Sequence, residues 1–138
     1  MISKKFNSER APQAVGLYPH ARMVGDLLFL SGVGPRKAGQ KDIPGVTLDN
    51  QGDIIDYDIA VQCHSVFENT RFILEDAGSS WDKIIDVQVF LTNMKDDFDI
   101  YNNIYAEYFK NNQPCRTTIE IKSLPTPIAI ELKVIATI

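Results

Sequence analysis

The chain has 138 residues, with 14 Lys or Arg against 18 Asp or Glu, so its formal net charge is −4 at pH 7. This length corresponds to about one domain, and we expect a single domain over residues 1–138. The acidic balance disfavours a nucleic-acid-binding protein, which usually carries a basic surplus. The sequence shows no apolar run long enough to span a membrane and no signal-peptide apolar region, so we expect a cytoplasmic protein.

The cysteines and histidines show no spacing typical of a metal site. Cys63 and Cys115 lack a CxxC partner, and His20 and His64 belong to no HxH or HExxH motif. We therefore expect no metal centre and no disulfide framework. Cys63 is most simply a small buried apolar residue.

The first half of the chain predicts a strand, a loop and a long helix. A short apolar run over residues 27–31 indicates a buried strand. Residues 34–52 are rich in Gly, Pro, Asp and Asn and are typical of a long loop. Apolar residues then recur at helical spacing over 56–77, and Gly78 stands where a helix commonly ends.

The next segments predict a strand followed by a second helix. Over residues 84–92, Ile85, Val87, Val89 and Leu91 alternate with polar residues and should share one face. Residues 96–109 carry an apolar set at helical spacing, and Pro114 prevents that helix from continuing.

The C-terminal part contains two strand-like runs, 114–121 and 128–135, joined by a turn at Leu124-Pro125. Because the connection is short, we expect the two strands to lie side by side. The element order predicts an α+β fold with both helices on one face of a single sheet. The other face also carries apolar residues, which indicates an oligomer interface.

Arg116 and Glu131 are the main candidates for chemistry. A guanidinium binds a carboxylate through two parallel hydrogen bonds. Glu131 interrupts an apolar strand and should lie opposite Ile130 and Leu132, where partial burial favours a role in proton transfer. The alternative for Arg116 is an ion pair with Glu120 or Glu131, and for Glu131 it is a solvent-facing position beside Lys133.

Two further polar residues are candidates for lining a pocket. Tyr18 lies in a turn-like segment before the first clear strand, where its phenol is able to donate a hydrogen bond into a pocket. The alternative role of this ring is packing. Ser31 ends the strand before Gly32 and is a pocket residue or the cap of a turn.

Taken together, nine short motifs resemble the RidA (YjgF) family of small enamine/imine deaminases along nearly the whole chain. They are residues 11–12, 16–18, 30–32, 69–78, 87–92, 101–105, 114–116, 124–125 and 130–132. The chain departs from the family pattern two positions after the arginine, where Thr118 stands in place of the common cysteine. Each motif is weak alone, whereas their order and spacing together are strong.

The resemblance implies a chorismate-mutase-like α+β fold and a homotrimer with a site at each subunit interface. It implies that Arg116 binds the substrate carboxylate, that Glu131 activates water, and that Tyr18 belongs to the catalytic set. The substrate-binding positions implied by the family are Ser31, Gly32, Asn102 and Thr118. The reaction releases ammonia from a 2-imino or 2-enamino acid and gives a 2-oxo acid. It needs no cofactor, because the imine carbon is already electrophilic.

Several segments, among them Tyr18-Pro19-His20 and Arg116-Thr117-Thr118, look more like the branch containing 2-aminomuconate deaminases. That substrate has a second carboxylate, for which Arg36 is the candidate cation. A solvated loop arginine is the alternative reading of Arg36. Two other functions stay open: an endoribonuclease or translation inhibitor, as attributed to some relatives, and a non-catalytic trimer that binds a metabolite carboxylate.

Overall fold

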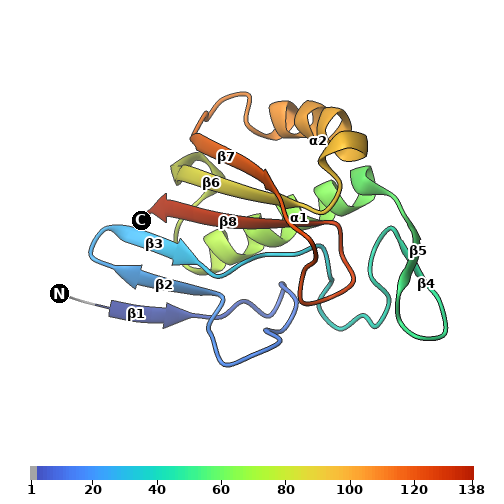
Figure 1. Cartoon of the computed structure of the whole chain (residues 1–138). Helices are drawn as coiled ribbons and strands as arrows, with labels where there is room; N and C mark the ends of the chain where they lie inside the picture. Colours follow the sequence, from blue (N-terminus) through green and yellow to red (C-terminus); the bar gives the residue numbers. More distant parts are fainter. Residues whose placement is uncertain (1–2) are drawn as a thin grey trace.

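The computed structural model describes residues 3–138 (Figure 1). Within them, the α-helices are α1 (Ile59–Asp76) and α2 (Met94–Tyr108), and a short 3-10 helix spans Trp81–Lys83. The strands are β1 (Ser3–Phe6), β2 (Ala21–Val24), β3 (Leu27–Leu30), β4 (Val46–Leu48), β5 (Ile54–Tyr57), β6 (Ile84–Leu91), β7 (Cys115–Glu120) and β8 (Ile130–Thr137). The α+β class predicted from the sequence is confirmed.

The main sheet has the strand order β1-β2-β3-β8-β6-β7. All neighbours are antiparallel except β6 and β7, which are parallel and are joined through α2. The prediction that the C-terminal strands are neighbours is therefore wrong, because β6 lies between β7 and β8. The turn after β7 carries the chain past β6, and both strands use β6 as their partner.

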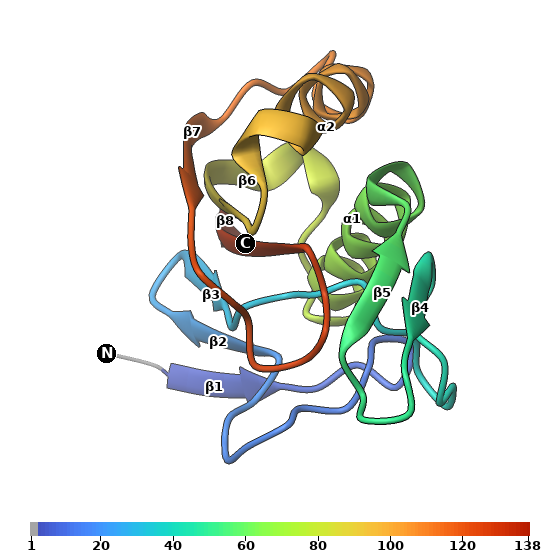
Figure 2. The ribbon, with the colours of Figure 1, turned by 45° about the vertical axis from the view of Figure 1, so that its right-hand side comes forward.

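Both helices cover the same face of the sheet (Figure 2). Asp58 caps α1 by accepting hydrogen bonds from the backbone N–H groups of Ala60 and Val61. The helix starts three residues later than predicted, because Ile54–Tyr57 form β5 instead. At its other end Gly78 has φ +86°, and the N–H of Ser79 donates to the carbonyl of Leu74, which confirms the predicted glycine stop.

Two predictions about the strands need correction. Ile85 does not share the buried face of β6: the pairing with β8 shifts between Ile84 and Asp86, so Ile84 is buried and Ile85 is 43% exposed. The expected long loop of 34–52 also contains β4, which pairs with β5 in a separate hairpin. The alternation of Val87, Val89 and Leu91 toward the core is confirmed.

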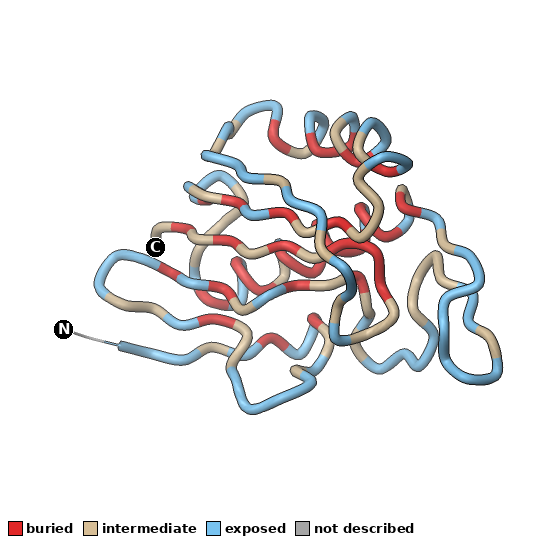
Figure 3. Tube along the Cα trace, viewed as in Figure 1, coloured by how far each residue is buried: buried red, intermediate tan, exposed pale blue. Residues whose placement is uncertain are grey.

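The face of the sheet without helices is partly apolar. Leu27 and Phe29 of β3 are 37% and 36% exposed there, and Ile119 of β7 is 41% exposed. Their neighbours Leu28 and Leu30 point into the helix-covered core and are fully buried. Figure 3 shows the same contrast along the trace, with buried positions alternating in β8 and mostly exposed positions in the edge strand β7. The sheet thus has a closed face and an open face.

Candidate functional site

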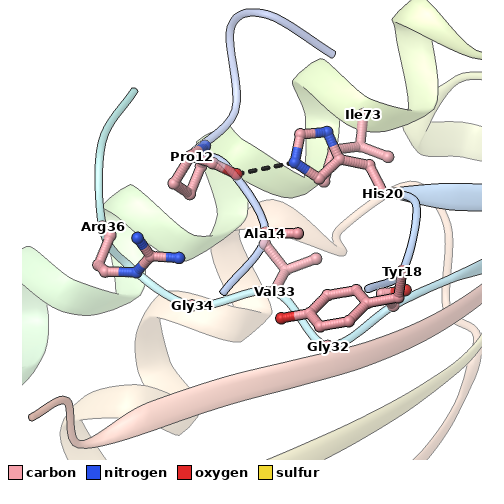
Figure 4. A pocket seen from close by; sticks show the side chains of 10 residues that line it. Pro12, Ala14, Tyr18, His20, Gly32, Val33, Gly34, Arg36 and Ile73 are labelled. Atoms are coloured by element: carbon pink, nitrogen blue, oxygen red, sulfur yellow. Dashed lines mark hydrogen bonds between the residues drawn. The ribbon is translucent and has the colours of Figure 1, made fainter. Parts of the chain in front are cut away.

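A pocket lies where the segment between β1 and β2 folds over the end of β3. Its lining includes Tyr18, Ser31, Gly32 and Arg36, which are four of the residues predicted for the site. In Figure 4 the Tyr18 hydroxyl and the Arg36 guanidinium point toward the same space. A neighbouring hollow of about 550 Å³ shares Tyr18 as a wall. We name this region the Tyr18 pocket.

The segment that carries Tyr18 is fixed by His20. The Nδ1 atom of His20 accepts a hydrogen bond from the N–H of Ser8 at 2.9 Å, and its Nε2 lies 2.7 Å from the carbonyl oxygen of Pro12. With Nδ1 accepting, Nε2 carries the proton and donates. The carbonyl of His20 also accepts from the N–H of Ser31, and the Ser31 hydroxyl donates to the carbonyl of Pro19 at 2.7 Å. These hydrogen bonds hold the segment that carries Tyr18 against the end of β3, and the two together form the walls of the pocket.

Arg36 enters the pocket from the loop after β3. Its Nη2 donates to the carbonyl of Gln13 at 3.0 Å, which ties it to the segment on the other side. Asn69 of α1 donates to the carbonyls of Gly34 and Arg36 and holds this loop in place. Arg36 is therefore a wall of the pocket as well as a cation, and it is not a freely solvated loop residue.

Glu131 lies on the open face of β8, as the alternation predicted, and is half-buried. Burial raises the pKa of its carboxyl group above the ordinary value. The carboxylate sits directly against Gly32: a Cβ at that position would lie 2.6 Å from Oε2 of Glu131. Glycine at this position allows the close approach, because any side chain would displace the carboxylate. Glu131 and the Tyr18 pocket are thus joined through Gly32.

Lys133 follows Glu131 on the same face, and its ammonium group donates to the carbonyl of Leu30. Burial lowers the pKa of this lysine. Because its ammonium is turned to the backbone of β3, Lys133 provides no ion-pair partner for Glu131 within residues 3–138. Glu131 thus lies beside Lys133 on the open face, as the alternative expected, but it is half-buried and not fully exposed to solvent.

Arg116 projects from the edge strand β7 on the helix-covered side. Its Nη1 donates to Oδ1 of Asn102 in α2 at 2.7 Å. The guanidinium carbon lies 4.7 Å from the ring centre of Tyr105 and 5.6 Å from that of Tyr101. Within residues 3–138 it forms no ion pair, so neither Glu120 nor Glu131 of the same chain is its partner. The remaining guanidinium donors are available for a ligand.

Thr118 lies two residues further along β7 on the same side as Arg116. Its hydroxyl is 3.0 Å from the hydroxyl of Tyr101. Burial raises the pKa of Tyr101, and the bond to Thr118 acts in the opposite direction. Thr118 therefore positions the aromatic surface on which Arg116 rests, and it borders the predicted carboxylate-binding group.

The predicted residues fall into separate groups within one chain. Arg116, Asn102 and Thr118 occupy the helix-covered side of the edge strand, whereas Glu131 and Gly32 belong to the open face and the Tyr18 pocket. Arg116 pairs with Val87 of β6, and Glu131 pairs with Phe90 of the same strand. Two strand spacings alone separate their backbones by roughly 10 Å. One chain does not bring Arg116 and Glu131 together.

The sequence reasoning missed some of these contacts. The aromatic support of Arg116 was present as Tyr101 and Tyr105, which are four residues apart and share one face of α2. The role of His20 had no signal, because its partners Ser8 and Pro12 are defined only by the folded loop. Among residues 3–138, no helix is long and apolar enough to cross a membrane, and no three potential metal ligands cluster.

The mixed sheet, its two covering helices and the pocket at the end of β3 define an α+β protein of the Rid type, and solved structures of this fold superpose on nearly the whole chain. Residues 8–138 match the family described as Endoribonuclease L-PSP. The chain belongs to this family, which confirms the resemblance found in the sequence.

Among its relatives is a RutC family protein of Pyrococcus horikoshii, which is 39% identical over 129 residues, covering 94% of this chain and 93% of the relative. A protein of unknown function of the conserved Rid family from Yersinia pestis superposes with a TM-score of 0.83 at 31% identity, over 99% of this chain and all of the other. The E. coli protein TdcF, whose crystal structure contains bound serine, has a TM-score of 0.84 at 28% identity, with 98% of each chain covered.

Proposed function

We propose that this protein is a cofactor-independent hydrolytic deaminase that converts 2-imino or 2-enamino acids to 2-oxo acids and ammonia. The observation that carries the proposal is the half-buried carboxylate of Glu131, with its raised pKa, held against Gly32 at the edge of the Tyr18 pocket. A carboxyl group in such surroundings is suited to accept and return a proton. Membership of the Rid-type family supports the same reaction class.

We further propose that the active unit is a homotrimer of these single domains, with each site formed between neighbouring subunits. Arg116 of one subunit would meet Glu131 and the Tyr18 pocket of the next. The support comes from the separation of Arg116 and Glu131 within one chain. Leu27, Phe29 and Ile119 are exposed on the open face, which is partly apolar. This supports self-association, because covering apolar surface with a second subunit lowers the free energy.

In the proposed mechanism, the substrate carboxylate forms two hydrogen bonds with Arg116, and Asn102 holds that guanidinium in place. Tyr18, Ser31, Gly32 and Arg36 form the facing wall, and Thr118 borders the carboxylate. The bound serine of TdcF supports a site for a small molecule with a carboxylate in this fold.

The chemical step uses water and one carboxylate. Glu131 removes a proton from a water molecule while the water oxygen bonds to the imine carbon and the C=N π electrons move to nitrogen. The nitrogen then takes the proton from Glu131, which gives a neutral carbinolamine. Glu131 next accepts the hydroxyl proton and passes it to the same nitrogen, so that the C–N bond breaks, ammonia leaves and the carbonyl of the 2-oxo acid forms. The charge of the substrate is balanced throughout by Arg116.

The test is the acceleration of ammonia release from imines generated in solution by an amino acid oxidase. We expect Arg116→Ala and Glu131→Gln each to lower kcat/KM by about 100-fold or more, since each removes a group acting on the reacting molecule. Glu131→Gln should still bind the 2-oxo acid product, which separates catalysis from simple metabolite binding. Wild-type rates in both variants would reject the proposal, and binding without any turnover would favour a non-catalytic trimer.

The family description and a putative endoribonuclease of Thermotoga maritima with a similar structure name a second candidate activity. The net charge of −4 gives little support to RNA binding. RNA cleavage that co-purifies with the protein and disappears in Arg116→Ala would establish it. The assignment of this chain to the 2-aminomuconate deaminase branch rests on sequence motifs and stays a prediction.

A further inference from the structure

A second cleft lies beside Arg116, away from the Tyr18 pocket. It is formed by the C-terminal end of α2 and the connection to β7, and its volume is about 370 Å³. Its walls include Tyr105, Phe109, Lys110, Gln113, Pro114 and Arg116. None of the predicted site residues except Arg116 belongs to it. We name it the Lys110 cleft.

The charged groups that line the Lys110 cleft are cations. Lys110 is exposed, and within residues 3–138 it forms no ion pair. Arg116 uses one guanidinium N–H for Asn102 and keeps the others. No carboxylate lines the cleft, although the charge of Asp86 reaches Tyr105 and contributes to its raised pKa. Two cations that share one cavity, neither of them in an ion pair within residues 3–138, favour an anionic ligand.

Tyr105 adds a polar group that lacks a partner. It is 8% exposed, and its hydroxyl has no hydrogen-bond partner within residues 3–138. Burial raises the pKa of this phenol to about 12, so it stays a neutral donor. A buried hydroxyl without a partner costs free energy, and a ligand oxygen near the floor of the cleft would reduce that cost.

From these contacts, we propose that the Lys110 cleft binds a second acidic group of the substrate. Arg116 would hold the carboxylate next to the imine carbon, and Lys110 would bind the distal carboxylate of a 2-imino dicarboxylic acid. Phe109 and Pro114 provide an apolar wall for the carbons between them. The assignment rests on the deaminase function proposed above and names the substrate class that the site prefers.

Arg36 was the cation expected for this role from the sequence. It already donates to the carbonyl of Gln13, and it belongs to the Tyr18 pocket, which contains no part of Arg116. Lys110 shares a cavity with Arg116 within the same chain. A dicarboxylate whose first carboxylate binds Arg116 therefore has Lys110 of the same chain for its second carboxylate and does not need Arg36.

The experiment compares the imines of glutamate and glutamine, which differ in a distal carboxylate or amide at nearly equal size. We expect Lys110→Met to lower the ratio of their kcat/KM values, glutamate over glutamine, by about fivefold or more, because a charge-assisted hydrogen bond is lost. Lys95→Met is the matched control, since Lys95 is an exposed lysine at the opposite end of α2 and should leave the ratio unchanged.

Two results would overturn the assignment. One is an unchanged ratio in Lys110→Met, and the other is a lowered ratio in Arg36→Met with Lys110→Met unaffected, which would place the distal carboxylate in the Tyr18 pocket. Calorimetric binding of 2-oxoglutarate separates this question from turnover. If wild-type protein hydrolyses neither imine, the deaminase function fails. The subsite then stands only if 2-oxoglutarate binds about fivefold more weakly to Lys110→Met than to Lys95→Met.

Discussion

The two faces of the sheet differ in what they offer to a substrate. The helix-covered side holds Arg116 at the edge strand β7, supported by Asn102 and by the rings of Tyr101 and Tyr105. The open face holds Glu131, half-buried against Gly32. Under the proposed function, Arg116 binds the substrate carboxylate and Glu131 activates water, and one chain does not bring the two residues together. The proposal therefore makes catalysis depend on association, with the second residue supplied by a neighbouring subunit.

The largest effect on activity is expected from a charged substitution on the open face of the sheet. Phe29→Glu places a carboxylate on a surface that we propose to be buried between subunits, which costs on the order of 3 kcal/mol per interface. We expect loss of the oligomer in analytical ultracentrifugation and loss of nearly all deaminase activity.

The matched control for Phe29→Glu is Ile100→Glu in α2. Ile100 is 46% exposed, slightly more than Phe29 at 36%, but it lies on a helix and not on the open face. The account predicts that Ile100→Glu keeps both the oligomer and the activity. A fully active Phe29→Glu monomer would contradict the proposed dependence on association.

A smaller effect is expected where Gly32 meets Glu131. The Cβ added by Gly32→Ala must push the Glu131 carboxylate aside, because it would lie 2.9 Å from Cδ. A displacement near 1 Å at a reacting group costs up to about 100-fold in rate, so we expect kcat to fall by about 10- to 100-fold. The folded state should lose little stability, because the displaced group is the end of a flexible side chain.

Gly34→Ala provides the control for this substitution. Its Cβ would lie 2.9 Å from Cδ1 of Ile128, so the crowding is similar but falls on an apolar side chain. We expect it to lower the melting temperature more than Gly32→Ala and to change kcat less. The reverse pattern would indicate that Gly32 matters for packing and not for the placement of the carboxylate.

The smallest effect is a stability change that has the opposite sign to the activity change. Since burial raises the folded-state pKa of Glu131, the folded protein binds the proton more tightly than the unfolded chain does. Stability from this group is present at low pH and is lost as pH rises from the ordinary glutamate pKa through the raised one. Glu131→Gln should therefore stabilise the fold at pH 7 while activity is lost.

Denaturant unfolding of wild type and Glu131→Gln across this pH range measures the difference directly. The variant should lack the decline in stability that wild type shows between the two pKa values. A variant that is less stable than wild type at pH 7 would mean that the charged carboxylate stabilises the fold, contrary to the direction of its pKa shift.

Local patterns in the sequence predicted the helices and the placement of Glu131 correctly. Helical spacing and Gly78 indicated α1, and strict alternation placed Glu131 opposite Ile130 and Leu132 in β8. These features depend on nearest neighbours and on one period, so a single sequence contains them. The family resemblance added the fold, because it compares the order of many weak motifs at once.

The pairing of strands that are far apart in the chain could not be predicted in the same way. The Leu124-Pro125 turn suggested a hairpin of β7 and β8, yet β6 lies between them, because each strand gains more pairing with the buried β6. The bulge that exposes Ile85 and the ring of Tyr105 beneath Arg116 likewise depend on partners far away in the chain. Sequence analysis therefore named both halves of the candidate site and misjudged how one chain places them.

The most direct test of the shared site mixes two inactive proteins. Arg116→Ala keeps Glu131, and Glu131→Gln keeps Arg116, so a mixed trimer contains interfaces at which both native groups meet. Random exchange of equal amounts through unfolding and refolding should restore about a quarter of the wild-type activity, because each site needs the right variant on both sides. Activity no higher than that of the two parents after refolding would contradict a site shared between subunits.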